Sequence, residues 1–185
     1  MLNLSYDTLI AAGTGDPQAR HVFACVLSVA ALNPAVPITD GLGLAPASLL
    51  TLIETYFPSF RPLAEALPAD ASAGTDAIEE PDLRHLLLDH RSRGVVEEEW
   101  LAAIVARRSL GANHLWQDLG LFHRRELSAL LNRHFHALAV QNVNDMKWKK
   151  FFYRQLCARD GMLICKAPNC AICTDFGLCF GSEDG

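Results

Sequence analysis

Apolar residues recur every three or four positions through most of the first 160 residues, which is the period of helices packed on one side. Proline and glycine separate these stretches, as expected at helix ends. No stretch alternates apolar and polar residues for long, so the pattern predicts an all-α fold. The expected helices span residues 17–32, 46–56, 60–67, 81–93, 95–109, 113–120, 123–139 and 146–159.

The chain is predicted to form one domain with a distinct C-terminal end. Residues 1–160 give a helical, bundle-like body, and residues 161–185 give an irregular cysteine-rich segment that belongs to the same domain. Residues 68–81 are small, polar and acidic, so we interpret them as a flexible loop. Residues 95–109 should form a strongly amphipathic helix, with acidic residues in its first turns and Arg107 and Arg108 in its last.

The overall composition excludes several protein classes. Half of the residues are hydrophobic and a fifth are charged, so wholesale disorder is excluded. No apolar run reaches the length of a membrane span, and the first residues lack the pattern of a secretion signal. A net charge of −5 gives no reason to expect nucleic acid as a partner. We therefore expect a cytoplasmic protein that binds neither membranes nor nucleic acid.

The cysteines carry the most specific signal. Four of the six fall within 15 residues, as Cys165, Cys170, Cys173 and Cys179, with the spacing C-x4-C-x2-C-x5-C. Such short gaps let four thiolates converge on one centre, and soft thiolates select zinc, copper(I) or an iron–sulfur cluster. The first three also match the opening spacing of plant-type iron–sulfur proteins. The spacing therefore predicts a metal centre in an irregular loop, without deciding which metal it holds.

Positive charge precedes and enters this cysteine run. Residues 121–170 carry nine Lys or Arg against three Asp or Glu. Lys147, Lys150 and Arg154 recur at helical spacing and form one stripe, and Lys166 lies inside the first cysteine loop. These cations would stabilise an anionic cluster and attract an oxyanion or an acidic partner. The alternative interpretation is an ordinary solvated helix face.

The other reactive residues give no second site. Cys25 lies among apolar residues and is expected in the core, and Cys157 is expected to be a half-buried thiol near a helix end, although a role as a spare ligand stays open. The histidines show no metal spacing; His114 alone is a candidate to reach a cluster. No Ser-His-Asp arrangement is visible, so we predict no catalytic residue.

Four segments together resemble the NifQ family of nitrogen-fixation proteins. They are Asn-His-Leu-Trp-Gln-Asp-Leu-Gly at 113–120, Arg-Glu-Leu-Ser at 125–128, Met-Lys-Trp-Lys-Lys-Phe-Phe-Tyr-Arg-Gln-Leu-Cys at 146–157, and the cysteine run with the Phe-Gly at 180–181. The resemblance is good over residues 80–181. It is only general over residues 1–67 and absent from the 68–81 loop.

The resemblance implies a carrier rather than an enzyme. It implies that Cys165, Cys170, Cys173 and Cys179 bind an iron–sulfur cluster of the 3Fe-4S or Mo-3Fe-4S type. The cargo would be molybdenum, received as molybdate or a molybdenum–sulfur species and donated for synthesis of the iron–molybdenum cofactor of nitrogenase. The implied partners are the nitrogenase iron protein and the cofactor-assembly scaffold proteins.

Two other interpretations of the cysteines come from different functional classes. A four-cysteine zinc site could staple the C-terminal end of a protein–protein interaction module. Alternatively, Cys170 and Cys173 could act as a C-x-x-C redox pair, but the βαβ context of such enzymes is missing. Colour separates these alternatives from the carrier, because iron–sulfur proteins are brown while zinc and dithiol proteins are colourless.

Overall fold

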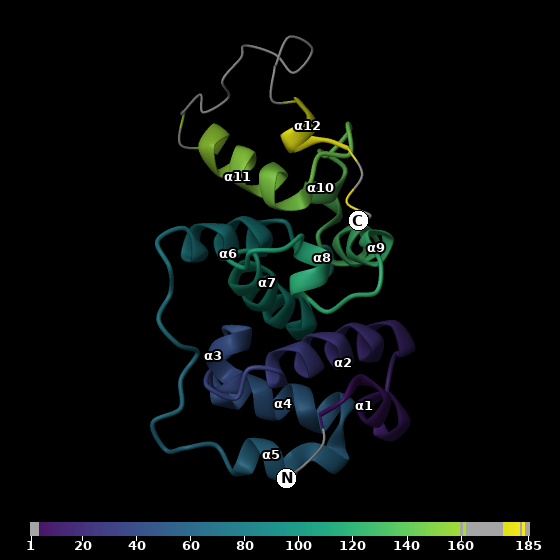
Figure 1. Ribbon diagram of the computed structural model, residues 1–185, viewed down its shortest axis with the longest axis vertical. Coiled ribbons are helices and arrows are strands. Elements are labelled where there is room, and N and C mark those ends of the chain that lie inside the picture. Colours follow the sequence, from purple (N-terminus) through teal and green to yellow (C-terminus); the bar gives the residue numbers. More distant parts are fainter. Residues whose placement is uncertain (1–3, 160, 162–175, 182, 184–185) are drawn as a thin grey trace.

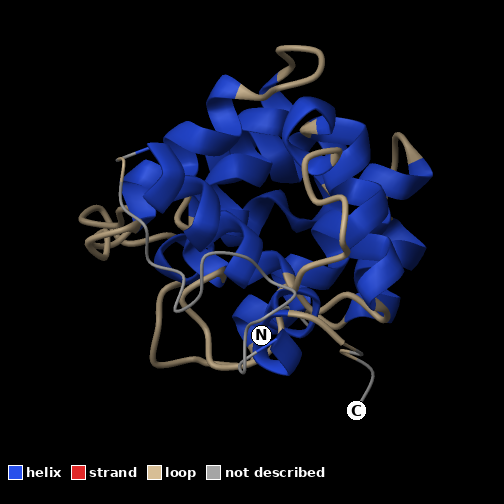
Figure 2. Ribbon diagram, turned by 90° about the horizontal axis from the view of Figure 1, so that it is seen from above, coloured by secondary structure: helices blue, strands red, loops and turns tan. Residues whose placement is uncertain are grey.

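The computed structural model describes residues 4–159, 161, 176–181 and 183, and every regular element among them is a helix (Figure 2). The prediction of an all-α fold is confirmed. The elements are α1 (Tyr6–Ala12), α2 (Pro17–Ala31), α3 (Ile38–Leu42), α4 (Pro46–Tyr56), η1 (Pro58–Phe60), α5 (Arg61–Glu65), α6 (Glu80–Asp89), α7 (Val96–Arg108), α8 (Leu115–Asp118), α9 (Arg124–His134), α10 (His136–Ala139), α11 (Trp148–Arg159) and α12 (Phe176–Cys179).

The helices are stacked along the long axis of the molecule (Figure 1). Helices α1 to α5 form the end that carries the N-terminus, α6 to α9 form the middle, and α10 to α12 form the opposite end. Helix α7 packs on both α6 and α3, and α11 packs on α6. The cysteine-rich end is therefore built on the middle layer. Among the described helices, none combines the length and apolar character that crossing a bilayer requires.

Helix α7 runs through the centre of the molecule. Its first turn carries three glutamates and its last turn Arg107 and Arg108, as predicted. The prediction that this helix is strongly amphipathic is wrong, because residues 101–106 are all buried. Such a helix is covered on every side by its neighbours rather than by solvent on one face. Helices α6, α3 and α8 supply part of this cover.

The helix expected over residues 123–139 is interrupted at Phe135. This residue leaves the helical region (φ −138°, ψ 47°) and separates α9 from α10. Contacts with the loop after α6 stabilise the break: the Ser92 N–H donates to the His134 carbonyl oxygen (2.9 Å), and the Ser92 hydroxyl accepts from the His136 N–H (2.9 Å). The Phe135 ring is fully buried. Tertiary contacts thus interrupt the single helix that the sequence periodicity predicts.

The last long helix begins two residues later than predicted. Asp145 adopts a left-handed conformation (φ 50°), which aspartate tolerates better than most residues. The Asn142 side chain closes this turn by accepting from the Met146 N–H and donating to its carbonyl oxygen, both at 2.8 Å. Helix α11 starts only at Trp148. The Asp145 carboxylate accepts from Arg124, the first residue of α9.

The acidic loop ends slightly earlier than predicted, since α6 already includes Glu80. The loop is anchored to the body at two points. Arg107 donates to the Ala73 carbonyl oxygen (3.0 Å), and Arg84 donates to the Asp76 carboxylate (2.8 Å). Its flexibility stays a prediction, as does the division of the chain at residue 160.

Candidate metal centre

Helix α11 leads into the cysteine run and is fixed to the body by its aromatic side. Trp148, Phe151 and Phe152 are buried, and the Trp148 ring lies edge-on to Phe151 with centroids 5.6 Å apart. The indole N–H of Trp148 donates to the Ser128 hydroxyl on α9 (3.2 Å). Aromatic burial of this size dominates the packing of a short helix. The entry to the cysteine run is therefore rigidly placed.

The far end of the run returns to the start of the same helix. Cys179 ends α12, and its carbonyl oxygen accepts from the Lys147 backbone N–H (2.8 Å). The Lys147 ammonium donates to the Gly177 carbonyl oxygen (3.2 Å). Phe176 stacks on Phe180, with centroids 4.4 Å apart, and Phe180 is buried in the core. Part of the segment predicted to be irregular is thus a short helix that packs beside α11 (Figure 1).

The chain leaves α11 at Arg159, and the described part that follows the cysteine run returns to the other end of this helix. Arg159 closes the helix and Cys179 lies near its first turn, and 12 helical residues rise by roughly 18 Å. Cys179 is half-buried and forms no disulfide. Cys165, Cys170 and Cys173 lie outside the described residues, so the convergence of four thiolates stays a prediction. Within the described part of the chain, no three His, Cys, Asp or Glu side chains gather as metal ligands.

The two remaining cysteines are both buried. Cys25 is completely inaccessible on α2, as predicted. Burial, and secondarily the charge of Glu126, raises the pKa of its thiol to about 12, so it stays protonated and unreactive. Cys157 lies on α11 and is only 6% exposed, which is more buried than predicted.

The predicted basic residues occupy different environments. Lys150 and Arg154 are exposed on α11, while Lys147 contacts α12 through its ammonium. Lys166 lies outside the described residues. Lys147 thus has a local structural role, in addition to any part it takes in attracting anions.

The adjoining Lys149 has a structural role that its position off the stripe did not indicate. Its ammonium donates to the Asp118 carboxylate (2.5 Å) and to the Gly111 carbonyl oxygen (2.7 Å). The other Asp118 oxygen accepts from the Asn113 side chain (3.0 Å). This cluster joins α11 to the loop between α7 and α8. It links two of the segments that carry the family resemblance.

A buried ion pair fastens the chain after the cysteine run. Glu183 is buried and accepts from the Arg124 Nε (2.7 Å), and His114 lies 3.5 Å from its other oxygen. Arg124 also donates to the Asp145 carboxylate (2.5 Å) and to the Met146 carbonyl oxygen (3.1 Å). Burial opposes the charge of Arg124, but the bond to Asp145 and the charge of Glu183 outweigh it and raise its pKa. We call these groups the C-terminal clamp.

Sequence comparison assigns the chain to a family. The family model described as NifQ matches residues 22–181, a range that contains all six cysteines and the four segments that carry the resemblance. The chain belongs to the NifQ family. This is a family of nitrogen-fixation proteins.

Curated relatives agree with this assignment over most of their length. The NifQ homolog of Sinorhizobium fredii is 42% identical over 90% of this chain and 73% of its own. NifQ of Azotobacter vinelandii is 41% identical over 77% of this chain and 78% of its own. NifQ of Rhodobacter capsulatus is 38% identical over 80% and 79%, respectively. A search of solved structures found no significant match.

The structure gives the NifQ-like segments physical roles. Within 113–120, Asp118 binds Lys149, and Gly120 has φ +71°, where an added β-carbon would lie 2.8 Å from the Cys25 carbonyl oxygen. Within 125–128, Ser128 accepts from Trp148. These contacts bring α2, α8, α9 and α11 together. The segments therefore build the platform on which the cysteine run is mounted.

Sequence analysis missed the C-terminal clamp. Arg124 and Glu183 are 59 positions apart, and no helical or motif spacing connects them. His114 was considered as a cluster ligand, whereas the structure places its ring beside Glu183. A lone acidic residue near a chain end normally indicates nothing more than a solvated terminus.

Replacing Arg124 by glutamine should loosen the return of the chain to α11. Glu183 would then be a buried carboxylate without its cation. Exposing this carboxylate to solvent costs less free energy than keeping it buried and unpaired. The bond between the Lys147 N–H and Cys179 should then open more often, so hydrogen exchange at the Lys147 amide should rise by about tenfold or more. Arg125→Gln removes the same charge from the exposed neighbouring position and should leave this exchange unchanged. Equal exchange in both variants would show that the clamp does not hold α12.

Proposed function

We propose that this protein carries a molybdenum–iron–sulfur cluster and donates molybdenum for synthesis of the nitrogenase iron–molybdenum cofactor. The observation that supports it best is the position of Cys179, a half-buried free thiol held by a backbone hydrogen bond at the start of the basic helix α11. Thiolate is the donor that iron and molybdenum–sulfur species prefer. Membership of the NifQ family supports the same function.

The cluster is the cargo, and Cys165, Cys170, Cys173 and Cys179 are its proposed ligands. A four-cysteine zinc module would use the same residues, but nothing in the family or in the fold favours it. The protein acts as a carrier and not as an enzyme in this proposal, so its residues need to bind, hold and release the cluster.

Basic residues next to these ligands stabilise negative charge. Lys150 and Arg154 extend from the exposed side of α11, and Lys166 lies in the sequence between the first two ligands. An oxyanion such as molybdate, or an anionic cluster, is attracted by this group. An acidic surface on a partner is attracted in the same way. We propose the nitrogenase iron protein and the assembly scaffold as these partners.

Release requires that one end of the site can open without unfolding the body. Helix α12 has only four residues, and Phe176 and Leu178 are 48% and 63% exposed beside Cys179. Elements with so few buried contacts open at low free-energy cost. Exposed apolar side chains beside a ligand also give a partner a surface to bind. We therefore place transfer at the Cys179 end, with α11 as the fixed side.

Metal analysis of protein purified without oxygen from cells supplied with molybdate tests this function. We expect several irons per chain, substoichiometric molybdenum, and the broad visible absorbance of a thiolate-ligated cluster. One zinc per chain, with no iron and no colour after anaerobic reconstitution, would overturn the carrier function and support the zinc-stapled module.

A further inference from the structure

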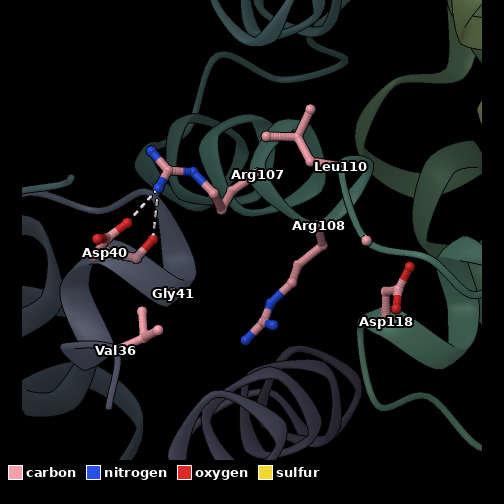
Figure 3. Close-up of a pocket in the computed structure, with 8 residues that line it drawn as sticks. Val36, Asp40, Gly41, Arg107, Arg108, Leu110 and Asp118 are labelled. Carbon is pink, nitrogen blue, oxygen red and sulfur yellow. Dashed lines mark hydrogen bonds and ion pairs between the residues drawn. The ribbon is translucent and has the colours of Figure 1, made fainter. Parts of the chain in front are cut away.

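A cavity of about 260 Å³ lies between α3 and the C-terminal end of α7. Its walls include Asp40 and Gly41 from α3, Arg107 and Arg108 from α7, and Asp118 from α8. Figure 3 shows the Arg108 side chain extending from α7 into the space between Gly41 and Asp118. The cavity is smaller than the pockets that hold drug-sized ligands, so it suits a small ion.

Three of the four charged groups in this wall already have partners. Asp40 is bound by Arg107, which also pairs with Glu80 (2.8 Å). Asp118 is bound by Lys149 (2.5 Å). Arg108 differs, because its Nε and Nη2 are buried and form no hydrogen bond within the part of the chain that the structure describes.

Leaving a guanidinium in this state is costly. A buried donor without an acceptor loses its hydration without compensation, and a cation loses more than a neutral group. Burial accordingly lowers the Arg108 pKa, and the charge of Asp118 opposes this shift only in part. Two buried guanidinium nitrogens without an acceptor among the described residues point to a ligand that supplies the acceptor oxygens.

We propose that this cavity is a binding site for a small tetrahedral oxyanion, held by the Arg108 guanidinium. The planar guanidinium presents paired N–H donors that match two oxygens of such an ion. Arg107 and Lys149 neutralise the two carboxylates of the wall, so they leave the Arg108 charge available to the anion. The described residues that line the cavity include no cysteine, and the site does not depend on the proposed function.

The cavity is coupled to the helix that carries the cysteine run. Gly111 and Asp118 form part of its wall, and both are bound by Lys149 of α11. An anion beside Arg108 competes with Asp118 for the positive charge of Arg108, and Asp118 is paired with Lys149 of α11. If molybdenum is the cargo, molybdate is the oxyanion that this site would hold near α11; that extension rests on the proposed function.

Calorimetric titration of the full chain with sodium sulfate and sodium molybdate, at low ionic strength and without phosphate, tests the site. Sulfate has no affinity for thiolates, and the part of its binding that depends on Arg108 reports on the cavity. We expect both anions to bind one site and to compete, and Arg108→Gln to weaken sulfate binding by about tenfold or more. Arg108→Gln should fold, because it removes a desolvated charge that has no partner.

Arg61→Gln is the matched control, since Arg61 is an exposed arginine that pairs with Glu54 (3.0 Å) on the surface. It should bind sulfate as the wild-type chain does. Equal sulfate binding by wild type and Arg108→Gln, or no binding by either, would overturn the cavity site. Molybdate that binds both chains equally while sulfate binds neither would also overturn it and would direct molybdate to the thiolates. If the purified chain contains no iron and Arg108→Gln abolishes sulfate binding, the oxyanion site is supported and the carrier function is overturned.

Discussion

Replacing Cys179 by alanine should remove most of the iron and molybdenum from anaerobically purified protein. Loss of one thiolate leaves an iron without its ligand and opens the site at the end where α12 packs on α11. We expect iron retention to fall by more than about tenfold, with the visible absorbance falling in proportion. The helical body should stay intact, because Cys179 is half-buried at the edge of the fold. Iron per chain, visible absorbance and far-ultraviolet circular dichroism measure these effects.

Two other cysteines supply matched controls for this experiment. Cys25→Ala changes a thiol that is completely buried in α2, so it should lower stability slightly and leave the iron content unchanged. Cys157→Ala changes a buried thiol on α11 and should also keep the iron. If Cys157→Ala lost the cluster while Cys179→Ala kept it, the ligand set proposed from the cysteine spacing would be wrong.

Local pattern predicted most helices because their signals lie in adjacent turns. The helices expected to begin at prolines 17 and 46 begin there in the structure. The break at Phe135 has no such signal, since it depends on Ser92 from another part of the chain. The complete burial of residues 101–106 likewise depends on which helices cover α7. The helix break and the complete burial of α7 therefore depend on tertiary contacts, which sequence periodicity does not report.

The candidate site likewise has one part that sequence spacing predicts and another part that only the fold reveals. Spacing alone makes the four cysteines candidate ligands, because metal ligands in a loop are close in sequence, and their convergence stays a prediction. Spacing does not reveal the ion pairs at α11 and at Glu183: Arg124 lies 59 positions from Glu183, and Lys149 lies 31 positions from Asp118. Arg108 was predicted as a helix-end charge, and only the structure shows that its buried Nε and Nη2 have no acceptor among the described residues. Ion pairs between distant residues need the fold before they can be recognised.

A buried histidine is placed to make stability depend on pH. His134 ends α9 and is 4% exposed. Arg93 donates to its Nδ1 (3.2 Å), which requires that nitrogen to be unprotonated. The fully buried Glu98 is 3.8 Å away and accepts from the backbone N–H groups of Arg93 (3.1 Å) and Gly94 (2.8 Å). Burial, followed by the charge of Arg93, lowers the His134 pKa from 6.5 to about 4.

Acidification below pH 6.5 should therefore destabilise the fold through His134. The unfolded chain takes up a proton near pH 6.5, whereas the folded chain takes it up only near pH 4, so the contribution is complete above pH 6.5 and is lost as pH falls between these values. The expected loss between pH 7 and pH 5 is about 2 kcal/mol.

Urea unfolding at both pH values measures this change. His134→Gln retains an acceptor for Arg93 but cannot titrate, so its free energy of unfolding should fall by about 2 kcal/mol less than that of the wild-type chain. His85→Gln changes an exposed histidine on α6 and should keep the wild-type pH dependence. An identical pH dependence in wild type and His134→Gln would mean that the ring is accessible to protons in the folded state. The hydrogen bonds between the loop at residues 92–94 and the end of α9 would then open more often than their lengths indicate.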